Sequence, residues 1–334
     1  MKVLRIAMLS SWHVHAPGYA RDILSRSDAK ITVVWDEDPV RGKNWAADLG
    51  VPFENDIDVL LARSDVDGVV VNAPTNLHAE IMVAAANAGK HIFTEKVMAP
   101  TVKECQTISE AVTKAGVKFC ISFPQRTWPV NLLAKKAVDD GLLGDVTLLR
   151  IRNAHNGAIA GWLPEHFYDA VACGGGAMID LGAHPMYLAR WLMGEPRRIT
   201  TLFNSYTERE VEDNAVALVE FANKGIAVIE TGFVSHSSPF SLELHGTEGT
   251  FLAGGPESTV RITSRKLEQN GHQGWFIPAR LPAALPMPLD QWIRGILEDE
   301  PILFGLEEGT QLTELMEGAM RSYRSGSQVE FPLD

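Results

Sequence analysis

A glycine-rich run in the middle of the chain carries a carboxylate and an imidazole at a spacing suited to proton transfer. Residues 174–176 are three consecutive glycines, and Asp180 and His184 follow, four residues apart. Residues at this spacing share one face of a helix, so the carboxylate can orient the imidazole and stabilise its charged form. Such an imidazole can take a proton from an alcohol. A plain helix entry with a satisfied histidine is the alternative interpretation.

A lysine stands after a short apolar run in the first half of the chain. Glu95 and Lys96 follow residues 91–94, which are typical of a buried strand. In open α/β sheets the carboxyl ends of the strands face a ligand crevice, where Lys96 would supply a cation. We therefore predict Lys96, Asp180 and His184 as catalytic residues.

The elements that would position these residues follow from the hydrophobic pattern. In the first half, strand-like runs such as 3–9 and 68–72 alternate with helical patterns such as 39–49 and 102–115. This alternation predicts parallel strands joined by crossover helices. Residues 199–263 are instead rich in strand patterns separated by turns, which predicts a mostly antiparallel open sheet.

These patterns predict an α/β protein with two domains. We place a dinucleotide-binding domain at residues 1–123 and an α/β domain for substrate binding and oligomerisation at 124–334, whose final helices can pack back on the first domain. The length of 334 residues and the 46% hydrophobic content are sufficient for two cores.

Composition limits the partners. The net charge of −12 argues against nucleic acid, which needs a surplus of lysine and arginine. Three scattered cysteines favour a reducing cytoplasm. The chain enters its first strand with no basic leader or long apolar segment, so we expect neither export nor a membrane partner.

An acidic pair at the end of the second predicted strand indicates the choice of cofactor. Asp36 stands there, in position to accept hydrogen bonds from the adenosine ribose. Glu37 is adjacent, and no arginine stands there to receive a 2′-phosphate, so we predict NAD(H) in preference to NADP(H). A solvated turn is the alternative for Asp36.

The first turn lacks the glycines that usually border a pyrophosphate. Serine hydroxyls and the amides at the start of the next helix could hold phosphate instead. His13 and His15 could also be metal ligands, but without a nearby carboxylate they form a weak metal signature, so we predict no metal. The turn reads Ser10, Ser11, Trp12, His13, Val14 and His15.

Several of these motifs together resemble the Gfo/Idh/MocA oxidoreductases. The resemblance is carried by residues 72–78, 89–96, 144–146, 174–184 and 245–250. It implies an N-terminal Rossmann domain, a C-terminal α/β domain with an open sheet, and NAD(P)-linked oxidation or reduction of sugars and cyclitols. It also implies a homodimer or homotetramer formed through that sheet. The family's Glu-Lys-Pro motif reads Glu95-Lys96-Val97 here.

The resemblance implies a role for each candidate residue. His184 would take the hydroxyl proton, Lys96 would polarise the oxygen, and Asp180 would steady the histidine or the substrate. Besides the first turn and Asp36, the cofactor-binding residues would be Asn72, Ala73, Pro74, Asn76, His78, Glu95 and Lys96. Aromatic and polar residues that cluster around the glycine run suit a sugar ring, so we predict substrate contacts there, with ordinary packing or surface exposure as the alternative for each residue. They are Arg126, His155, Trp162, His166, Tyr168 and Asp169.

Two other functions stay open at this point. Trp12 at the middle of the first turn is compatible with a noncatalytic ligand-sensing protein that kept the fold but lost tight nucleotide binding. A metal-dependent lyase or hydrolase using His13 and His15 is the other alternative.

Overall fold

The computed structural model describes residues 3–271 and 273–333, which form two compact units. Unit 1 comprises the chain up to Ser122 together with Pro286–Thr313, and unit 2 comprises Phe123–Leu285 together with the chain from Glu314 onward. No helix in the described ranges has both the length and the apolar character needed to cross a membrane.

Unit 1 is built on a parallel five-stranded sheet with the order β2-β1-β3-β4-β5. Every residue of β3 is buried, as expected for a parallel sheet whose two faces are both covered. This confirms the predicted Rossmann-type domain. The strands are β1 (Leu4–Leu9), β2 (Ala29–Trp35), β3 (Gly68–Val71), β4 (His91–Thr94) and β5 (Phe119–Ile121).

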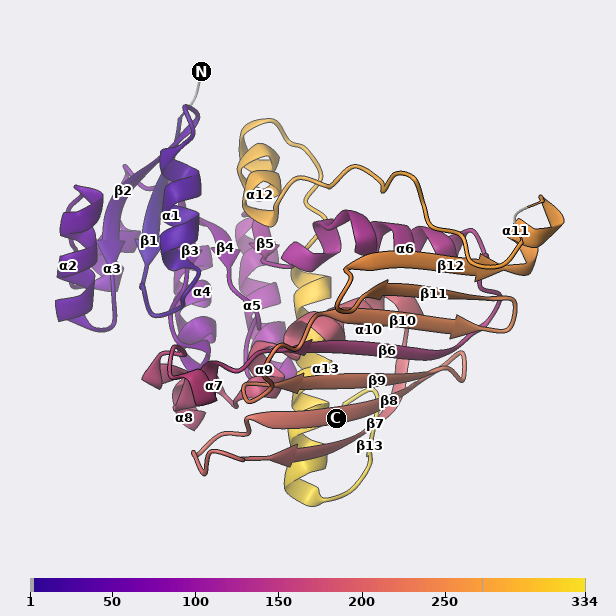
Figure 1. Ribbon diagram of the computed structural model, residues 1–334. Coiled ribbons are helices and arrows are strands. Elements are labelled where there is room, and N and C mark those ends of the chain that lie inside the picture. Colours follow the sequence, from indigo (N-terminus) through magenta and orange to yellow (C-terminus); the bar gives the residue numbers. More distant parts are fainter. Residues whose placement is uncertain (1–2, 272, 334) are drawn as a thin grey trace. The chain divides into compact units, whose positions relative to one another are not determined.

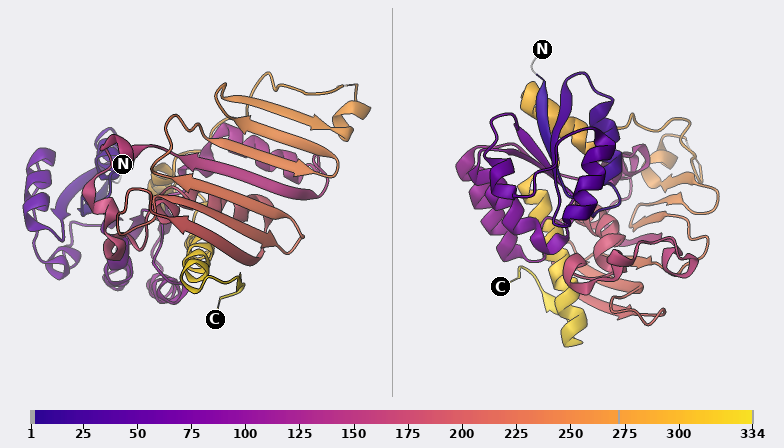
Figure 2. Two further views of the ribbon diagram at one scale, coloured as in Figure 1. Left: turned by 60° about the horizontal axis from the view of Figure 1, so that its bottom comes forward. Right: turned by 90° about the vertical axis from the view of Figure 1, so that its left-hand side faces the viewer.

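Helices flank both faces of this sheet (Figure 2). Their ends follow local rules: the Asp38 side chain caps α2 by accepting from two backbone amides, and Thr101 and Glu104 form a capping box on α5. The helices are α1 (Ala16–Leu24), α2 (Pro39–Leu49), α3 (Ile57–Leu61), α4 (His78–Asn87), α5 (Val102–Ala115), α12 (Pro288–Leu297) and the first part of α13 (Leu306–Ser325).

Unit 2 is built on an eight-stranded sheet with the order β12-β11-β10-β6-β9-β8-β7-β13. All neighbours pair antiparallel except β6 and β9, which confirms the predicted mostly antiparallel sheet. The strands are β6 (Val146–Ala154), β7 (Pro196–Asn204), β8 (Asn214–Phe221), β9 (Ile226–Gly232), β10 (Ser241–Gly246), β11 (Gly249–Gly254), β12 (Thr259–Ser264) and β13 (Val329–Glu330).

Helices of unit 2 cover one face of this sheet and leave the other open (Figure 1). The helix α10 packs on β6 and β9, and α6 packs on β11. Along β8, buried and exposed residues alternate, as a half-covered sheet requires. The helices are α6 (Pro129–Asp139), α7 (Gly157–Ala160), α8 (Ala170–Cys173), α9 (Ala177–Asp180), α10 (Ala183–Met193) and α11 (Arg265–Gln269).

The single helix expected to carry Asp180 and His184 is two helices. Asp180 is the last residue of α9, and His184 is the second residue of α10. Between them the amide of Gly182 bonds the carbonyl oxygen of Ala177, five residues back, instead of the oxygen four residues back. A Cβ at Gly182 would lie 2.4 Å from the carbonyl oxygen of Met178, so only glycine fits this junction.

Candidate functional site

The turn between β1 and α1 takes a glycine-like conformation without glycine. Ser10 has a φ of 71°, which lies in the left-handed region. Trp12 is buried, so its ring is turned into the protein, whereas Val14 is exposed. The turn thus has its first residue in the left-handed region that glycine favours, while it carries bulky side chains.

Amides of this turn are already bonded within unit 1. In a glycine-rich turn such amides face the pyrophosphate. Here these amides instead donate to side chains of the turn itself and to Asp36, which follows β2. Ser11 N donates to Asp36 at 2.9 Å, Trp12 N to Ser10 Oγ at 3.0 Å, and His15 N to His13 Nδ1 at 3.2 Å.

Asp36 holds the turn in place. Its carboxylate is fully buried and accepts bonds from the amides of Ser11 and Asp38, each at 2.9 Å. The guanidinium of Arg41 also donates to it, at 2.6 Å and 3.0 Å. The premise that no arginine stands near Asp36 is therefore wrong, because the first turn of α2 brings Arg41 back onto it.

Two polar side chains of unit 1 have buried atoms without a hydrogen-bond partner among the described residues. Glu37 Oε2 is buried and has no hydrogen-bond partner among the residues the structure describes, and burial raises the pKa of this carboxyl group. The side chain of Asn72, at the end of β3, is buried with neither its oxygen nor its nitrogen partnered within the same ranges. Unpaired buried polar groups are costly, and a hydroxyl-bearing ligand would satisfy them.

His78 ties together the loops that follow β3 and β4. Its ring nitrogens lie 3.0 Å from the carbonyl oxygen of Ala73 and 2.9 Å from that of Val97. The ring is buried, and this burial lowers its pKa. Of the other residues expected near the cofactor here, Pro74 is buried and Asn76 is exposed.

Lys96 is buried at the end of β4, beside a carboxylate. The peptide between Lys96 and Val97 is cis, at the position where the family motif has proline. Glu95 accepts a bond from the Lys96 amide at 3.0 Å and contacts His15 Nδ1 at 2.8 Å. The two histidines of the first turn therefore do have a carboxylate beside them, which corrects the expectation from sequence.

In unit 2, His184 is buried and its ring is held by a tyrosine. His184 Nδ1 lies 2.9 Å from the hydroxyl of Tyr187, and the amide of Gln125 donates to that hydroxyl at 3.1 Å. Phe123 stacks on the Tyr187 ring with centroids 4.3 Å apart. Sequence reasoning missed Tyr187, although its spacing of three residues from His184 on an expected helix could have indicated it.

The glycine run before Asp180 is anchored by a glutamate that the sequence did not single out. Both carboxylate oxygens of Glu212 accept backbone bonds at 2.9 Å, from Gly176 and Met178. The carbonyl oxygen of Glu212 accepts from Ala177 at 2.8 Å. Glu212 thereby fixes the start of α9, which ends at Asp180.

Two of the predicted substrate residues form an aromatic cluster. His155 stacks on Phe233 with centroids 5.1 Å apart, and Trp162 lies 4.5 Å from the His155 ring. Burial lowers the pKa of His155, and the charge of Asp180 opposes this shift. The ring of Trp162 is about half exposed.

The remaining predicted substrate residues have structural partners of their own. Asp169 caps α8, and the Arg209 guanidinium lies 3.6 Å from the ring centre of Tyr168. Arg126 lies 5.0 Å from the ring centre of Trp191. His166 is partly exposed beside Phe167.

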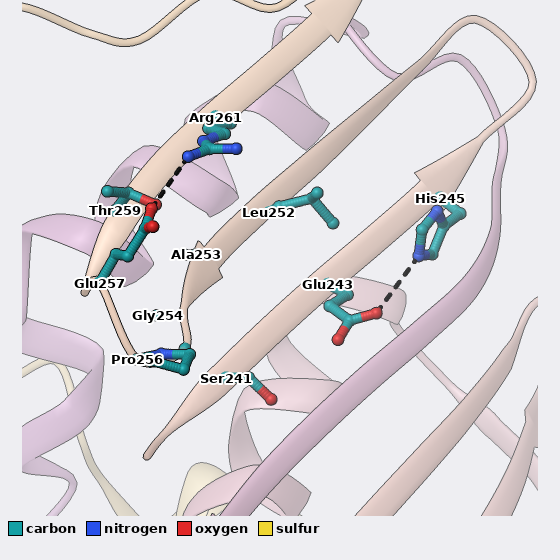
Figure 3. Close-up of a pocket in the computed structure, with 11 residues that line it drawn as sticks. Ser241, Glu243, His245, Leu252, Ala253, Gly254, Pro256, Glu257, Thr259 and Arg261 are labelled. Atoms are coloured by element: carbon teal, nitrogen blue, oxygen red, sulfur yellow. Dashed lines mark hydrogen bonds and ion pairs between the residues drawn. The ribbon is translucent and has the colours of Figure 1, made fainter.

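A shallow hollow on strands β10 to β12 contains none of the predicted site residues (Figure 3). His245 Nε2 lies 3.6 Å from Glu243 Oε2 there, and Arg261 pairs with Glu257 at 3.0 Å. Its polar side chains thus pair along the strand surface.

Unit 1 is a Rossmann-type domain built on a parallel sheet, and unit 2 combines an open, mostly antiparallel sheet with the buried His184. The model of an NAD-binding Rossmann-fold oxidoreductase family matches residues 13–123, and the GFO/IDH/MocA C-terminal domain matches residues 131–252. The chain belongs to the Gfo/Idh/MocA family of oxidoreductases.

Characterised relatives cover most of the chain at low identity. Inositol 2-dehydrogenase of Rhizobium meliloti is 24% identical over 93% of this chain and 94% of its own length. Levoglucosan dehydrogenase of Pseudarthrobacter phenanthrenivorans is 29% identical over 60% of this chain and 59% of its own. A solved levoglucosan dehydrogenase in complex with NADH superposes with a TM-score of 0.84 at 21% identity, covering both chains fully.

Proposed function

We propose that this oxidoreductase transfers a hydride between NAD(H) and a hydroxyl-bearing carbon of a sugar, a cyclitol or a derivative. The names of the relatives support this class of substrate, since they include inositol and levoglucosan dehydrogenases. The observation that carries the proposal is the buried His184, whose ring is oriented by Tyr187. An oriented imidazole suits proton transfer with an alcohol.

The unpaired polar groups of unit 1 fit the cofactor. Glu37 Oε2 can accept hydrogen bonds from ribose hydroxyls, and the Asn72 side-chain amide can both accept and donate them. The sequence predicted this ribose-binding role for Asp36. Ser10 to His15 would border the pyrophosphate. Arg41 is neutralised by Asp36 and Glu37, so a 2′-phosphate would have to compete with two carboxylates. This supports a preference for NAD(H) over NADP(H).

The bound cofactor supplies a nicotinamide ring that accepts or donates hydride. His184 would take the proton of the reacting hydroxyl, or return it in the reductive direction. Lys96 would donate a hydrogen bond to the same oxygen and favour its developing negative charge. Asp180 would steady the histidine or bind a substrate hydroxyl.

The aromatic cluster of unit 2 suits a sugar ring. A partly exposed Trp162 beside His155 offers an apolar surface with a polar edge. Burial keeps His155 largely neutral at pH 7, so it would act as a hydrogen-bond partner and not as a fixed charge. Arg126, His166, Tyr168 and Asp169 complete the proposed substrate set.

The open face of the unit 2 sheet supports an oligomer. Leu148, Leu202, Val216, Leu218 and Ile226 all expose apolar side chains on strands of this sheet. We propose that a second copy covers this face, giving a homodimer or homotetramer. The small number of scattered cysteines supports a cytoplasmic setting.

Cofactor binding and turnover test the proposal separately. NADH fluorescence titration of the purified chain should show binding, and a panel containing myo-inositol and levoglucosan with NAD⁺ should reveal turnover. His184→Ala should lower kcat by about 10²–10⁴-fold with an unchanged Kd for NADH, because a general base acts on the reacting proton. His236→Ala, at an exposed loop residue, is the control.

Two results would contradict the proposal. Wild-type protein that binds neither NADH nor NADPH at millimolar concentration would favour the ligand-sensing alternative. A His184→Ala variant that keeps turnover within a few-fold of wild type would remove His184 from the reaction.

A further inference from the structure

Three side chains of the kinds that bind metals meet at the first turn of unit 1. His13 and His15 come from the turn itself, and Glu95 comes from the end of β4, 80 residues beyond His15. One ligand atom from each residue lies within 4.8 Å of those of the other two. His15 Nδ1 is 2.8 Å and His13 Nδ1 is 4.0 Å from Glu95 Oε1.

The carboxylate of Glu95 is an anion held inside the protein. Its side chain is only 2% exposed. A buried anion needs cationic partners, and this one is aimed at two imidazoles.

Neighbouring groups fix the orientation of this carboxylate. The Tyr19 hydroxyl donates to Glu95 Oε1 and lies 2.7 Å from Ser122 Oγ, while the Lys96 amide donates to Glu95 Oε2 at 3.0 Å. Hydrogen bonds of this kind orient the ligands in metal sites and are part of what makes them bind.

We infer that His13, His15 and Glu95 form a binding site for a divalent transition-metal cation of the zinc class. Two imidazoles and one carboxylate are a common set of three protein ligands for zinc, with a fourth position left for water or an anion. All three residues lie within unit 1. The inference does not depend on the proposed hydride transfer.

Closing the site around a metal ion requires both histidine side chains to move. Zinc holds nitrogen and oxygen ligands at about 2.0–2.2 Å, which puts ligand atoms about 3.3 Å apart in a tetrahedron. His15 Nδ1 already lies closer than this to Glu95 Oε1, and its side chain is 46% exposed and can shift. His13 Nδ1 is 4.0 Å from Glu95 Oε1, is buried, and accepts a bond from the His15 amide. Glu95 is therefore the fixed ligand, and metal binding requires the His13 ring to give up its bond from the His15 amide and turn toward Glu95.

Cobalt binding tests the site directly. Chelator-treated, full-length protein is titrated with Co²⁺, and the visible absorption of the bound ion is followed; Zn²⁺ is then added as a competitor and quantified by elemental analysis. We expect one equivalent per chain. His15→Ala and Glu95→Gln should each weaken binding by more than about 100-fold, since even outer partners are worth about 10–100-fold.

A second imidazole–carboxylate pair in the chain provides the matched control. His245 lies 3.6 Å from Glu243 on the unit 2 sheet, and among the residues that the structure describes no third histidine, cysteine or carboxylate completes a cluster with them. His245→Ala should therefore leave the cobalt titration unchanged. Circular dichroism checks folding, and the exposed His15 carries the test if the buried Glu95→Gln variant does not fold.

The inference fails if wild-type protein shows neither cobalt absorption nor stoichiometric zinc, or if His15→Ala binds the metal as wild type does. NADH titration in the presence of chelator is a separate measurement. Its failure would count against the proposed function, and the metal titration would stand on its own.

Discussion

At the scale of single residues, the Tyr187 hydroxyl bonds Nδ1 of His184 and leaves Nε2 as the nitrogen for proton transfer. The Tyr187 oxygen can accept a bond from a protonated Nδ1, or its hydroxyl can donate to an unprotonated Nδ1. In the first case His184 Nε2 has a lone pair and can take the alcohol proton, and the imidazolium that forms, still bonded through Nδ1 to Tyr187, can return that proton in the reductive direction. One tyrosine thereby serves both directions of the proposed reaction.

Replacing Tyr187 with phenylalanine should affect proton transfer more than substrate binding. We expect kcat to fall about 10-fold, the free-energy scale of one hydrogen bond, with KM little changed and the pH profile of kcat displaced. Steady-state kinetics across pH would measure this. Tyr206→Phe, at an exposed tyrosine, is the control. An unchanged pH profile would show that Tyr187 serves only packing.

Glu37 should set the choice between the two dinucleotides. Its carboxylate contacts Arg41 and opposes a 2′-phosphate. In Glu37→Gln the charge is lost and Arg41 keeps one carboxylate partner, so the ratio of Kd values for NADPH and NADH should fall by about 10-fold. Fluorescence titrations at fixed ionic strength would measure the ratio, with Glu80→Gln, at an exposed helix residue, as control. Equal weakening of both cofactors would contradict this role.

At the scale of elements, the glycine run before α9 is required by packing. A Cβ at Gly176 would lie 2.1 Å from the carbonyl oxygen of Glu212, so no side chain fits there. Glu212 also accepts hydrogen bonds from the backbone amides at the start of α9. The close contact between the glycine run and Glu212 therefore positions Asp180 at the end of that helix.

Gly176→Ala should therefore destabilise the protein by about 3 kcal/mol, the upper part of the range for overpacked sites. Gly18 in α1 is the matched control, because nothing lies within 4 Å of a Cβ added there. Gly18→Ala should change the free energy of unfolding by less than about 1 kcal/mol, and in the stabilising direction. Urea unfolding measures both. Equal effects of the two substitutions would refute the packing argument.

Sequence patterns predicted the elements far better than the contacts between them. Helix 39–49 and helix 102–115 were expected with the bounds that the structure has, because caps and periodicity are local signals. Arg41 on Asp36, Glu95 beside His15, and Glu212 on Gly176 were not expected. Each of these contacts depends on how the chain folds in three dimensions. The local hydrophobic pattern does not indicate which segments become neighbours.

At the scale of the whole molecule, the open sheet face should control assembly. Leu218 is 46% exposed on β8, one of the two inner strands among the four that carry the exposed apolar residues. Leu218→Glu should convert an oligomer to a monomer, because a charge in a desolvated interface is costly. Sedimentation velocity would measure this, with Val171→Glu, at an exposed residue outside the sheet, as control. A wild-type monomer, or an unaltered oligomer in the variant, would contradict this assembly.

The order in which unit 1 is assembled along the chain has a consequence during synthesis. Trp292 of α12 is fully buried, with its ring 6.0 Å from Phe93 of β4, so it completes the core of a sheet whose strands end before residue 122. Residues 123–285 must be translated before Trp292 emerges, which takes about 10–30 s at about 5–20 residues per second. During that interval the nascent chain exposes part of its Rossmann core, and this is when chaperones at the ribosome would bind it.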